Sequence, residues 1–458
     1  MSNRPKQRRL ALAAAVSVAI ASAGGSIAIA ATSDSASTAS SLVPRVLANT
    51  VPRVLADAHE LGQLASTERI SLDLPLVIPH EAALDAYVAG EYTPGNPDYH
   101  KFLTPAQFGR EFGAPATEVT AATNALHALG LTTAAPSANR LFVSVSGTVA
   151  TVERTFAVHL ANFELGSLPA FYANTGDITL PASLSRIVSG VVGLDSAGTP
   201  QPQLQRPSLN ELREHPNLGT PSGVDGGATP CGQAALGGGY TAPDLATGYD
   251  FDGLYAKGFH GEGMSAALVE FDDFHDSNVS TMESCYGIKT PVTRRLVDGG
   301  VGGPPGSGEA EDMADITTLL EMDPKLAHLY VYEAPITGGG AVLKTGDAEI
   351  DLYNAFVTDD LAPVLSSSWG NCEELQSQAY NDLFATVAEE AAAQGQQIFD
   401  AAGDSRGGRL SRLGDTHQRQ HQRRAGSRRA VDHRRGRHRP RRRVDRPGSG
   451  HPRRGHVE

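Results

Sequence analysis

The chain has 458 residues and a formal net charge of -13, from 38 Lys and Arg against 51 Asp and Glu. This length is enough for two or three folded domains. The charge is uneven, because residues 405–458 hold 18 Arg, no Lys and four acids, which leaves 20 basic and 47 acidic residues before them. The acidic body is typical of a secreted protein that works at low pH, where protonation reduces self-repulsion. Beyond the N-terminus no run is long and apolar enough to span a bilayer, which excludes a multi-span membrane protein.

The N-terminus has the pattern of an export signal. Basic residues up to Arg9 precede an apolar run from Leu10, and Ala28-Ile29-Ala30 offers a cleavage site. We therefore predict a secretory signal peptide over 1–31 and an extracellular location without a membrane partner after cleavage. The alternative is an uncleaved membrane anchor, although Ser and Gly-Gly interrupt the run. Residues 32–50 are rich in Ser, Ala and Thr, and we predict that they are disordered.

A first folded unit is predicted over 51–196. Its segments alternate between strand and helix patterns, and together they indicate a small α+β sandwich. The predicted elements are a strand at 68–78, helices at 80–92, 105–113 and 116–130, and a strand, turn and helix over 139–160. Residues 197–243 are rich in Pro, Gly, Asn and Gln, as a linker would be.

A second unit, 244–404, alternates strands and helices, which favours a parallel sheet covered on both faces. The predicted strands are 264–271, 327–335, 362–370 and 396–404, and the predicted helices are 311–323, 347–359 and 378–395. In such sheets the functional residues lie at the carboxyl ends of strands. The stretches SSSWG and AAGDS both lie at such ends.

After Ser405 the composition changes abruptly. Residues 405–458 contain seven apolar residues and no aromatic residue, so they cannot bury enough surface to offset chain entropy, and we predict disorder. A GC-rich gene read one base out of register gives this mixture of Arg, Gly, Pro, Ala and His. We therefore interpret the tail as the product of a frameshift.

Several stretches together carry a resemblance to a known family. The first unit contains LDLPLVIPHEAALDAYV, NPDYHKFLTPAQFGREFG and NRLFVSVSGTVATVERTF, and the second contains ALVEF, GEAEDMADITTLLEMDPKLAHLYVYEAP, VLSSSWG and AAGDS. Over roughly residues 55–405 the chain resembles the sedolisin family of serine-carboxyl peptidases, in particular its kumamolisin-like members with their activation propeptide. The resemblance implies a subtilisin-like α/β parallel sheet, truncated here, preceded by an α+β, ferredoxin-like propeptide domain.

The first candidate site is a pair of carboxylates, Glu311 and Asp315, in EDMAD. Their i, i+4 spacing places both on one face of a helix. Two like charges this close raise one pKa, so the pair shares a proton and can act as base and then acid at low pH. The resemblance implies this role, with the glutamate in place of a histidine. The alternative is an acidic surface helix, since Glu309 and Asp312 lie nearby.

Three further positions match the family. Asp404 matches the aspartate that donates to the oxyanion, for which it must be protonated; the alternative is an aspartate that caps the next element. Glu270 and Trp369 match positions that extend the hydrogen-bond chain behind the glutamate. Their alternatives are a charge at a strand end and a packed aromatic ring.

The family's nucleophile is absent from this sequence. It belongs in a Ser-Gly-Thr-Ser-type turn well after the oxyanion aspartate, and none of Ser405, Ser411, Ser427 and Ser449 has those flanks. Calcium is expected for the family, but its acidic and backbone ligands have no match here. The histidines show no metal-ligand spacing, so we predict no metal site.

Three cysteines, Cys231, Cys285 and Cys372, are disulfide candidates, and the odd number leaves one thiol without a partner in this chain. The sequence alone leaves the pairing open.

We predict a secreted serine-carboxyl endopeptidase precursor that hydrolyses polypeptides at acidic pH and is inhibited by its own propeptide. This chain, without the serine, is expected to be inactive. One alternative is an exported polyanion-binding protein that uses its Arg-rich tail. The tail lacks the aromatic residues of single-strand binders, so we expect no specific nucleic-acid partner. Another alternative is a propeptide-type peptidase inhibitor.

Overall fold

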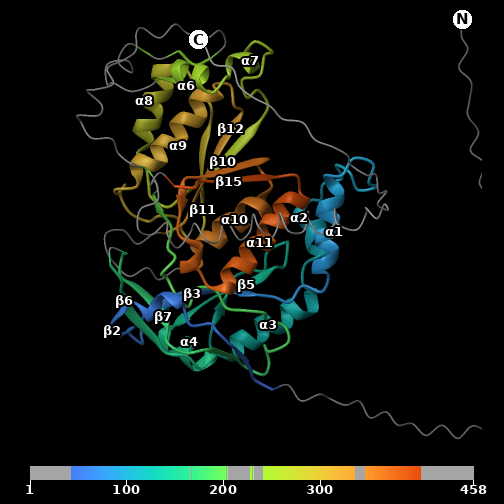
Figure 1. The fold of residues 1–458 in the computed structure, drawn as a ribbon, viewed down its shortest axis with the longest axis vertical. Helices are drawn as coiled ribbons and strands as arrows, with labels where there is room; N and C mark the ends of the chain where they lie inside the picture. The colour runs from blue at the N-terminus through green and yellow to red at the C-terminus, as the bar shows by residue number, and fades with distance from the viewer. Residues whose placement is uncertain are drawn as a thin grey trace, which may run out of the picture. The chain divides into compact units, whose positions relative to one another are not determined.

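The computed structural model describes residues 43–166, 168–202, 204, 227–229, 231, 241–335 and 346–403 (Figure 1). All of these lie in one compact unit, Leu42–Glu458. The predicted signal peptide, most of the linker, Asp404 and the Arg-rich tail lie outside the described residues. No helix in the described part is long and apolar enough to cross a membrane.

The first half of the chain builds three small antiparallel sheets with helices packed on them. Their strand orders are β2-β6-β7, β3-β5-β4 and β1-β8. The elements are β1 (Arg45–Leu47), η1 (Arg53–Ala56), β2 (His59–Gln63), β3 (Arg69–Pro75), α1 (Glu81–Glu91), α2 (Pro105–Glu111), α3 (Ala116–Ala128), β4 (Thr132–Thr133), β5 (Phe142–Thr148), α4 (Val149–Phe156), β6 (Leu160–Glu164), β7 (Phe171–Asn174) and β8 (Ile178–Leu180).

Local sequence explains these elements. On β3, Ile70, Leu72 and Leu74 alternate into a buried apolar cluster, as a half-buried strand requires. Helix α2 begins with a capping box, in which the Thr104 hydroxyl accepts the Gln107 N–H and the Gln107 side chain accepts the Thr104 N–H.

The prediction of disorder for 32–50 is wrong for Arg45–Leu47, which form β1 and pair with β8. The backbone partners for β1 lie more than a hundred residues further along the chain. Local composition therefore gives no sign of this pairing.

The second half is a five-stranded parallel sheet of order β11-β12-β10-β13-β15 (Figure 1). This confirms the prediction of a parallel α/β unit. Its elements are α6 (Ala242–Gly248), α7 (Asp252–Tyr255), β10 (Ser265–Glu270), α8 (Asp276–Tyr286), β11 (Val292–Leu296), α9 (Glu309–Met322), β12 (His328–Glu333), α10 (Ala348–Asp359), β13 (Val364–Ser367), β14 (Trp369–Gly370), η3 (Glu373–Leu375), α11 (Gln378–Ala393) and β15 (Gln397–Asp400).

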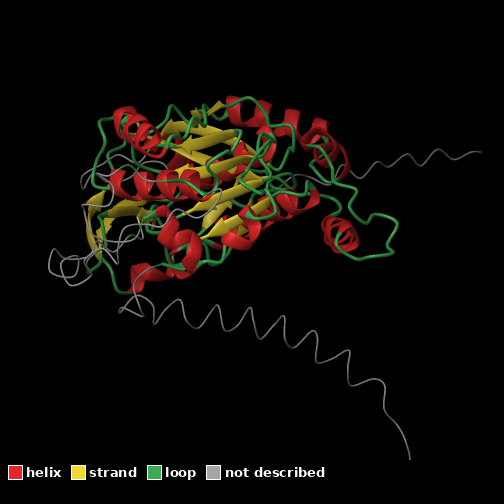
Figure 2. Ribbon diagram, turned by 90° about the horizontal axis from the view of Figure 1, so that it is seen from above, coloured by secondary structure: helices red, strands yellow, loops and turns green. Residues whose placement is uncertain are grey.

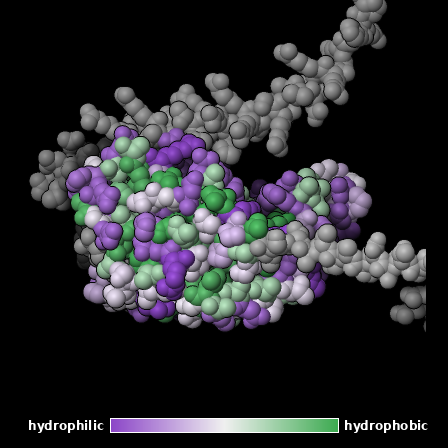
Figure 3. Space-filling model, turned by 90° about the horizontal axis from the view of Figure 1, so that it is seen from below, coloured by the Kyte–Doolittle hydropathy of each residue, from purple (hydrophilic) through white to green (hydrophobic). Residues whose placement is uncertain are grey.

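Helices cover both faces of this sheet, so the strands lie between them (Figure 2). Ala266 and Leu268 of β10 join the apolar cluster of α6, α8 and α9. Ala267 and Val269, which point to the opposite face, join the cluster of α10 and α11. Both faces of β10 are therefore apolar, as a strand buried on two sides requires. On the face shown in Figure 3, polar and apolar residues are interspersed, as on ordinary protein surfaces.

The two halves share one of the apolar clusters. Phe108 and Phe112, at the end of α2, pack in the same cluster as α10 and α11. A polar contact completes this junction, since the Asn139 amide donates to Asn354 Oδ1 and to Glu390 Oε2, both at 2.7 Å. Burying an amide in this way is favourable only because its hydrogens find partners.

Candidate active site

The predicted site residues gather at the carboxyl ends of β10 and β13, beside the first turns of α9. The loop before α9 is held by Asp272, whose two carboxylate oxygens accept the N–H groups of Gly306 (2.9 Å) and Gly308 (2.6 Å). Gly308 caps the helix, so this clamp fixes where α9 begins. It thereby sets the position of the acidic side chains on the first turns.

Glu311 lies in the first turn of α9 and is only 5% exposed. Its Oε2 accepts a hydrogen bond from the backbone N–H of Leu204, which belongs to the segment after the first half of the chain. That segment begins with β9 (Gln201–Pro202), which pairs antiparallel with β14 through Trp369 and Gly370. An extended stretch of the chain's own backbone therefore lies against the predicted glutamate.

Asp315 lies one turn further along α9 and is partly buried. Its Oδ1 accepts a hydrogen bond from the Ser368 hydroxyl at 2.8 Å. Burial raises the pKa of Asp315 to about 6, the charge of Glu311 raises it as well, and the bond from Ser368 acts in the opposite direction. The structure therefore brings Glu311 and Asp315 together, as their spacing predicts.

Glu270 and Trp369 also lie in direct contact. The indole Nε1–H of Trp369 donates to Glu270 Oε2 at 2.7 Å, and both side chains are buried. Burial raises the pKa of Glu270 well above its usual range, and the charges of Asp312 and Asp315 raise it further. Burial and the neighbouring charges therefore both favour the protonated form of this carboxyl.

Asp312 is the member of this group that the sequence does not predict. It is fully buried, and its carboxyl lies against that of Glu270. Two ionised carboxylates cannot form a hydrogen bond with each other, because both offer only acceptors. The two can bond only when one holds a proton. Burial is the main cause that raises the pKa of Asp312 to about 7.

On α9, the carboxyl of Glu270 acts on that of Asp312, the residue after the predicted glutamate. A sequence signal for Asp312 exists, since Asp312, Ile316 and Leu320 follow i, i+4, i+8 spacing and all three are buried. Asp312 therefore extends the core-facing stripe of α9 and does not belong to an acidic surface.

The remaining candidates are placed as follows. Cys231 and Cys285 form a disulfide, and Cys372 is a partly buried thiol. Asp404, the predicted oxyanion residue, lies outside the described residues, although Gly403 just before it follows β15.

Comparison with known proteins decides the family. Residues 56–197 match the family described as Pro-kumamolisin, activation domain. Xanthomonalisin of Xanthomonas sp. (strain T-22) is 26% identical over 387 residues, which are 82% of this chain and 44% of that protein. Kumamolisin of Bacillus sp. (strain MN-32) is 26% identical over 374 residues, 79% of this chain and 61% of that protein. Sedolisin of Pseudomonas sp. (strain 101) is 27% identical over 357 residues, which are 76% of this chain and 56% of that protein.

These matches support a sedolisin-family protein. The chain spans about half the length of the curated relatives that it matches, from 44% to 61% of each. The matched activation domain ends just before β9. Leu204, whose amide donates to Glu311, therefore lies in the first segment after that domain.

Proposed function

We propose that this chain is the precursor form of a secreted sedolisin-type serine peptidase that cleaves polypeptides at acidic pH. The observation that carries the proposal is the position of β9 and Leu204. The segment pairs antiparallel with β14, and its next described amide donates to Glu311. Pairing of an extended peptide with an exposed strand is a common way to bind peptide substrates.

The same contact supports self-inhibition by the activation domain. The segment Gln201–Leu204 follows that domain directly and occupies the place beside Glu311 that a substrate backbone would need. Because it is part of the same chain, its effective concentration is high, so a free peptide competes poorly. The precursor would then become active only when this segment leaves.

The acids on α9 suit chemistry at low pH. In the proposed reaction Glu311 takes a proton from the attacking group and returns it to the leaving amine, while Asp315 shares that proton. The raised pKa of Asp315, about 6, keeps a proton available near this pair at acidic pH. The protonated Asp404 would donate to the oxyanion.

The nucleophilic serine has no counterpart in the sequence, and we propose that residues 405–458 arise from a change of reading frame. The described edge of the sheet supports this proposal. Strand β15 pairs with β13 on one side, and its Phe399 side chain is 56% exposed. A further strand on β15 would satisfy the backbone groups of that edge, and a helix connected to it could cover Phe399. In its printed form the chain would not hydrolyse peptides. The subtilisin-like sheet and the ferredoxin-like activation domain remain part of this proposal.

Resequencing the DNA that encodes residues 395–458 and beyond is the first test. A one-base correction should restore a frame with a Ser-Gly-Thr-Ser-type turn and acidic calcium ligands. The protein from that frame should hydrolyse a quenched fluorescent peptide at acidic pH, and Glu311→Gln should reduce the rate by at least a hundredfold, in the range that acid–base catalysis contributes.

Glu309→Gln is the matched control, because Glu309 lies on the same helix but bonds to His275 at 2.6 Å at the surface. It should leave the rate unchanged. An unaltered reading frame, or hydrolysis that survives Glu311→Gln, would overturn the proposal.

A further inference from the structure

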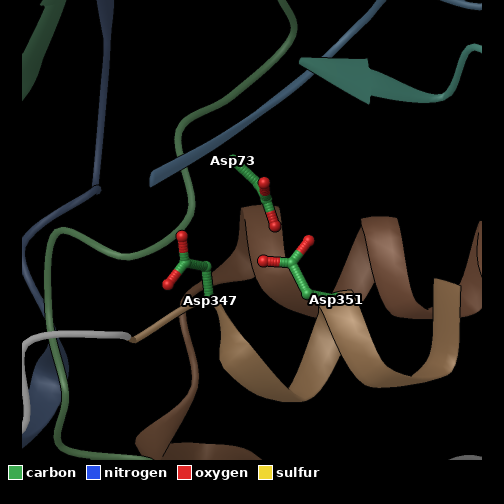
Figure 4. Close-up of side chains that lie close together, drawn as sticks. All are labelled: Asp73, Asp347 and Asp351. Carbon is green, nitrogen blue, oxygen red and sulfur yellow. The ribbon is translucent and has the colours of Figure 1, made fainter. Parts of the chain in front are cut away.

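A second group of buried acids lies where the two halves of the chain meet. Asp73 comes from β3 of the activation domain, and Asp347 and Asp351 come from the start of α10 (Figure 4). One carboxylate oxygen from each lies within 4.8 Å of the other two. Asp73 is 0% exposed and Asp347 is 1% exposed.

The local structure directs these side chains to one point. On β3, Leu72 and Leu74 face the core of the activation domain, so Asp73 between them faces the opposite way. Asp347 caps α10, and Asp351 follows at i+4 on the same helix face. Figure 4 shows the Asp73 carboxyl pointing toward Asp351 and Asp347.

Hydrogen bonds do not account for this arrangement. Both oxygens of Asp73 and one of Asp347 are buried without a hydrogen-bond donor in normal bonding geometry. The Ser144 hydroxyl, opposite Asp73 on β5, lies near enough only to offset part of the effect of burial on the pKa of Asp73. The other groups that act on the cluster are carboxyls, since Asp298 acts on both Asp73 and Asp351.

Buried like charges of this kind need compensation. The N-terminus of α10 supplies about half a positive charge, which is too little for three carboxylates. Either protons or a cation must supply the rest. A cation suits the geometry, because the ligand atoms are all oxygens, which hard divalent ions prefer.

The burial of the group favours Ca²⁺ over Mg²⁺, because Mg²⁺ keeps several of its waters and is rarely held by protein ligands alone. Ligands on opposite sides of Ca²⁺ lie about 4.6–5.2 Å apart, since each bond is about 2.3–2.6 Å. One Ca²⁺ could therefore contact all three oxygens within the 4.8 Å limit. We propose that Asp73, Asp347 and Asp351 form a Ca²⁺ site shared by the activation domain and the peptidase half.

This site is separate from the acids on α9 and does not depend on the missing nucleophile. It has a distinctive consequence, because one ligand belongs to the activation domain. The ion would be bound while Asp73 remains in place and would lose a ligand when the activation domain leaves. It would therefore stabilise the precursor and not the separated peptidase half.

Calorimetric titration of the full chain with CaCl₂ at neutral pH, after removal of metals with a chelator, tests the proposal. We expect one Ca²⁺ per chain and a rise in melting temperature with Ca²⁺ that Mg²⁺ at the same concentration does not match. Asp73→Asn and Asp351→Asn should each weaken binding at least tenfold. Asp382→Asn is the control, since that exposed carboxylate bonds only to Gln378 on its own helix, and it should bind Ca²⁺ as the wild type does.

Terbium luminescence of the wild-type chain gives a second measure of where the ion binds, and it does not depend on whether the aspartate variants fold. The phenol of Tyr172 lies close enough to Asp347 for the carboxylate to raise its pKa, so it can sensitise Tb³⁺ bound there. Tyr172→Phe should reduce the luminescence by more than half without changing the CaCl₂ titration.

The proposal is overturned if the wild type neither binds Ca²⁺ nor gains stability from it. It is also overturned if Asp73→Asn and Asp351→Asn bind Ca²⁺ as the wild type does, or if Asp73→Asn is more stable than the wild type with Ca²⁺ present, as a cluster held by shared protons would be.

Discussion

The acids on α9 and the acids around Asp73 are both buried, but their neighbours differ. On α9, neutral or backbone donors reach three of the four carboxyls: Trp369 bonds to Glu270, Ser368 to Asp315 and Leu204 to Glu311. Around Asp73, no donor bonds to either oxygen of Asp73 or to one oxygen of Asp347. The α9 group also has buried oxygens without a donor, namely both of Asp312 and one each of Glu270 and Asp315. Burial alone therefore does not reveal how an acidic group is used.

The difference indicates which compensation each group needs. A hydrogen bond from an indole or a hydroxyl fixes the orientation of a carboxyl and shifts its pKa, as acid–base chemistry requires. A cluster such as that of Asp73, in which carboxyls face one another and several oxygens have no donor, is suited to an ion. Each prediction below removes one donor or one acid and asks whether this distinction holds.

The largest expected effect is the pH dependence of stability. Asp312 has a folded-state pKa of about 7 against an ordinary 3.8, so between these values the native state holds a proton that the unfolded state has lost. Unfolding free energy should therefore fall as pH rises from about 4 to 7, by about 1.4 kcal/mol per pH unit for one such group. Asp312→Asn should flatten this slope in denaturant titrations. An equal slope in the variant would show that another acid controls it.

A comparable effect is expected at Glu270, tested by a pair of substitutions. Glu270→Ala removes the acceptor of the Trp369 N–H and leaves a cavity, which should cost about 3 kcal/mol of unfolding free energy. Glu270→Gln keeps an acceptor and removes the need for a shared proton, so its cost at neutral pH should stay below about 1 kcal/mol. Chemical denaturation measures both, and equal losses would mean that the indole bond contributes little.

The contact of Leu204 with Glu311 should be worth about 2 kcal/mol, as for hydrogen bonds to charged groups. Leu204→Pro removes the amide hydrogen, so hydrogen exchange of the segment 197–204 should accelerate by about thirtyfold. Leu204→Ala keeps the amide and serves as the control. Unchanged exchange in the proline variant would contradict the proposed occupation of the site by this segment.

The smallest effect is expected at Ser368. Ser368→Ala removes the donor to Asp315, so the pKa of Asp315 should rise above about 6, at a cost of about 1 kcal/mol or less. A carboxyl NMR titration would measure this shift. Ser366→Ala, two residues earlier on β13, should leave the titration of Asp315 unchanged, and a shift in that variant instead would argue against the Ser368 hydroxyl as the donor.

The amino-acid sequence alone was sufficient to predict structural features that depend on a repeating local pattern of residues. The apolar runs around β10 and β12 predicted a parallel sheet, because strands buried on both faces carry apolar side chains at every position. The i, i+4 spacing of Glu311 and Asp315 predicted their shared helix face, which the structure has. The family resemblance pointed to Glu270 and Trp369, whose contact spans 99 residues and has no local signal.

Features that depend on distant segments could not be predicted in this way. Asp73 lies at a position of alternating β3 that would face solvent in an isolated sheet, and it is buried because distant segments, including the start of α10, lie beside it. Asp312 was hidden for a different reason, since three other acids surround it in the sequence and make its helix look like a water-facing one. Its place in a stripe with Ile316 and Leu320 is the one local sign of burial.

The disulfide between Cys231 and Cys285 has a consequence for maturation by proteolysis. It ties the segment after the activation domain to α8 of the peptidase half. A single cut between Cys231 and Cys285 would leave the two pieces covalently joined, whereas a cut between Leu204 and Cys231 would free the activation domain together with Leu204, whose amide donates to Glu311. The bond thus restricts productive cleavage to the stretch before Cys231, and the new amino terminus of the processed protein would lie there.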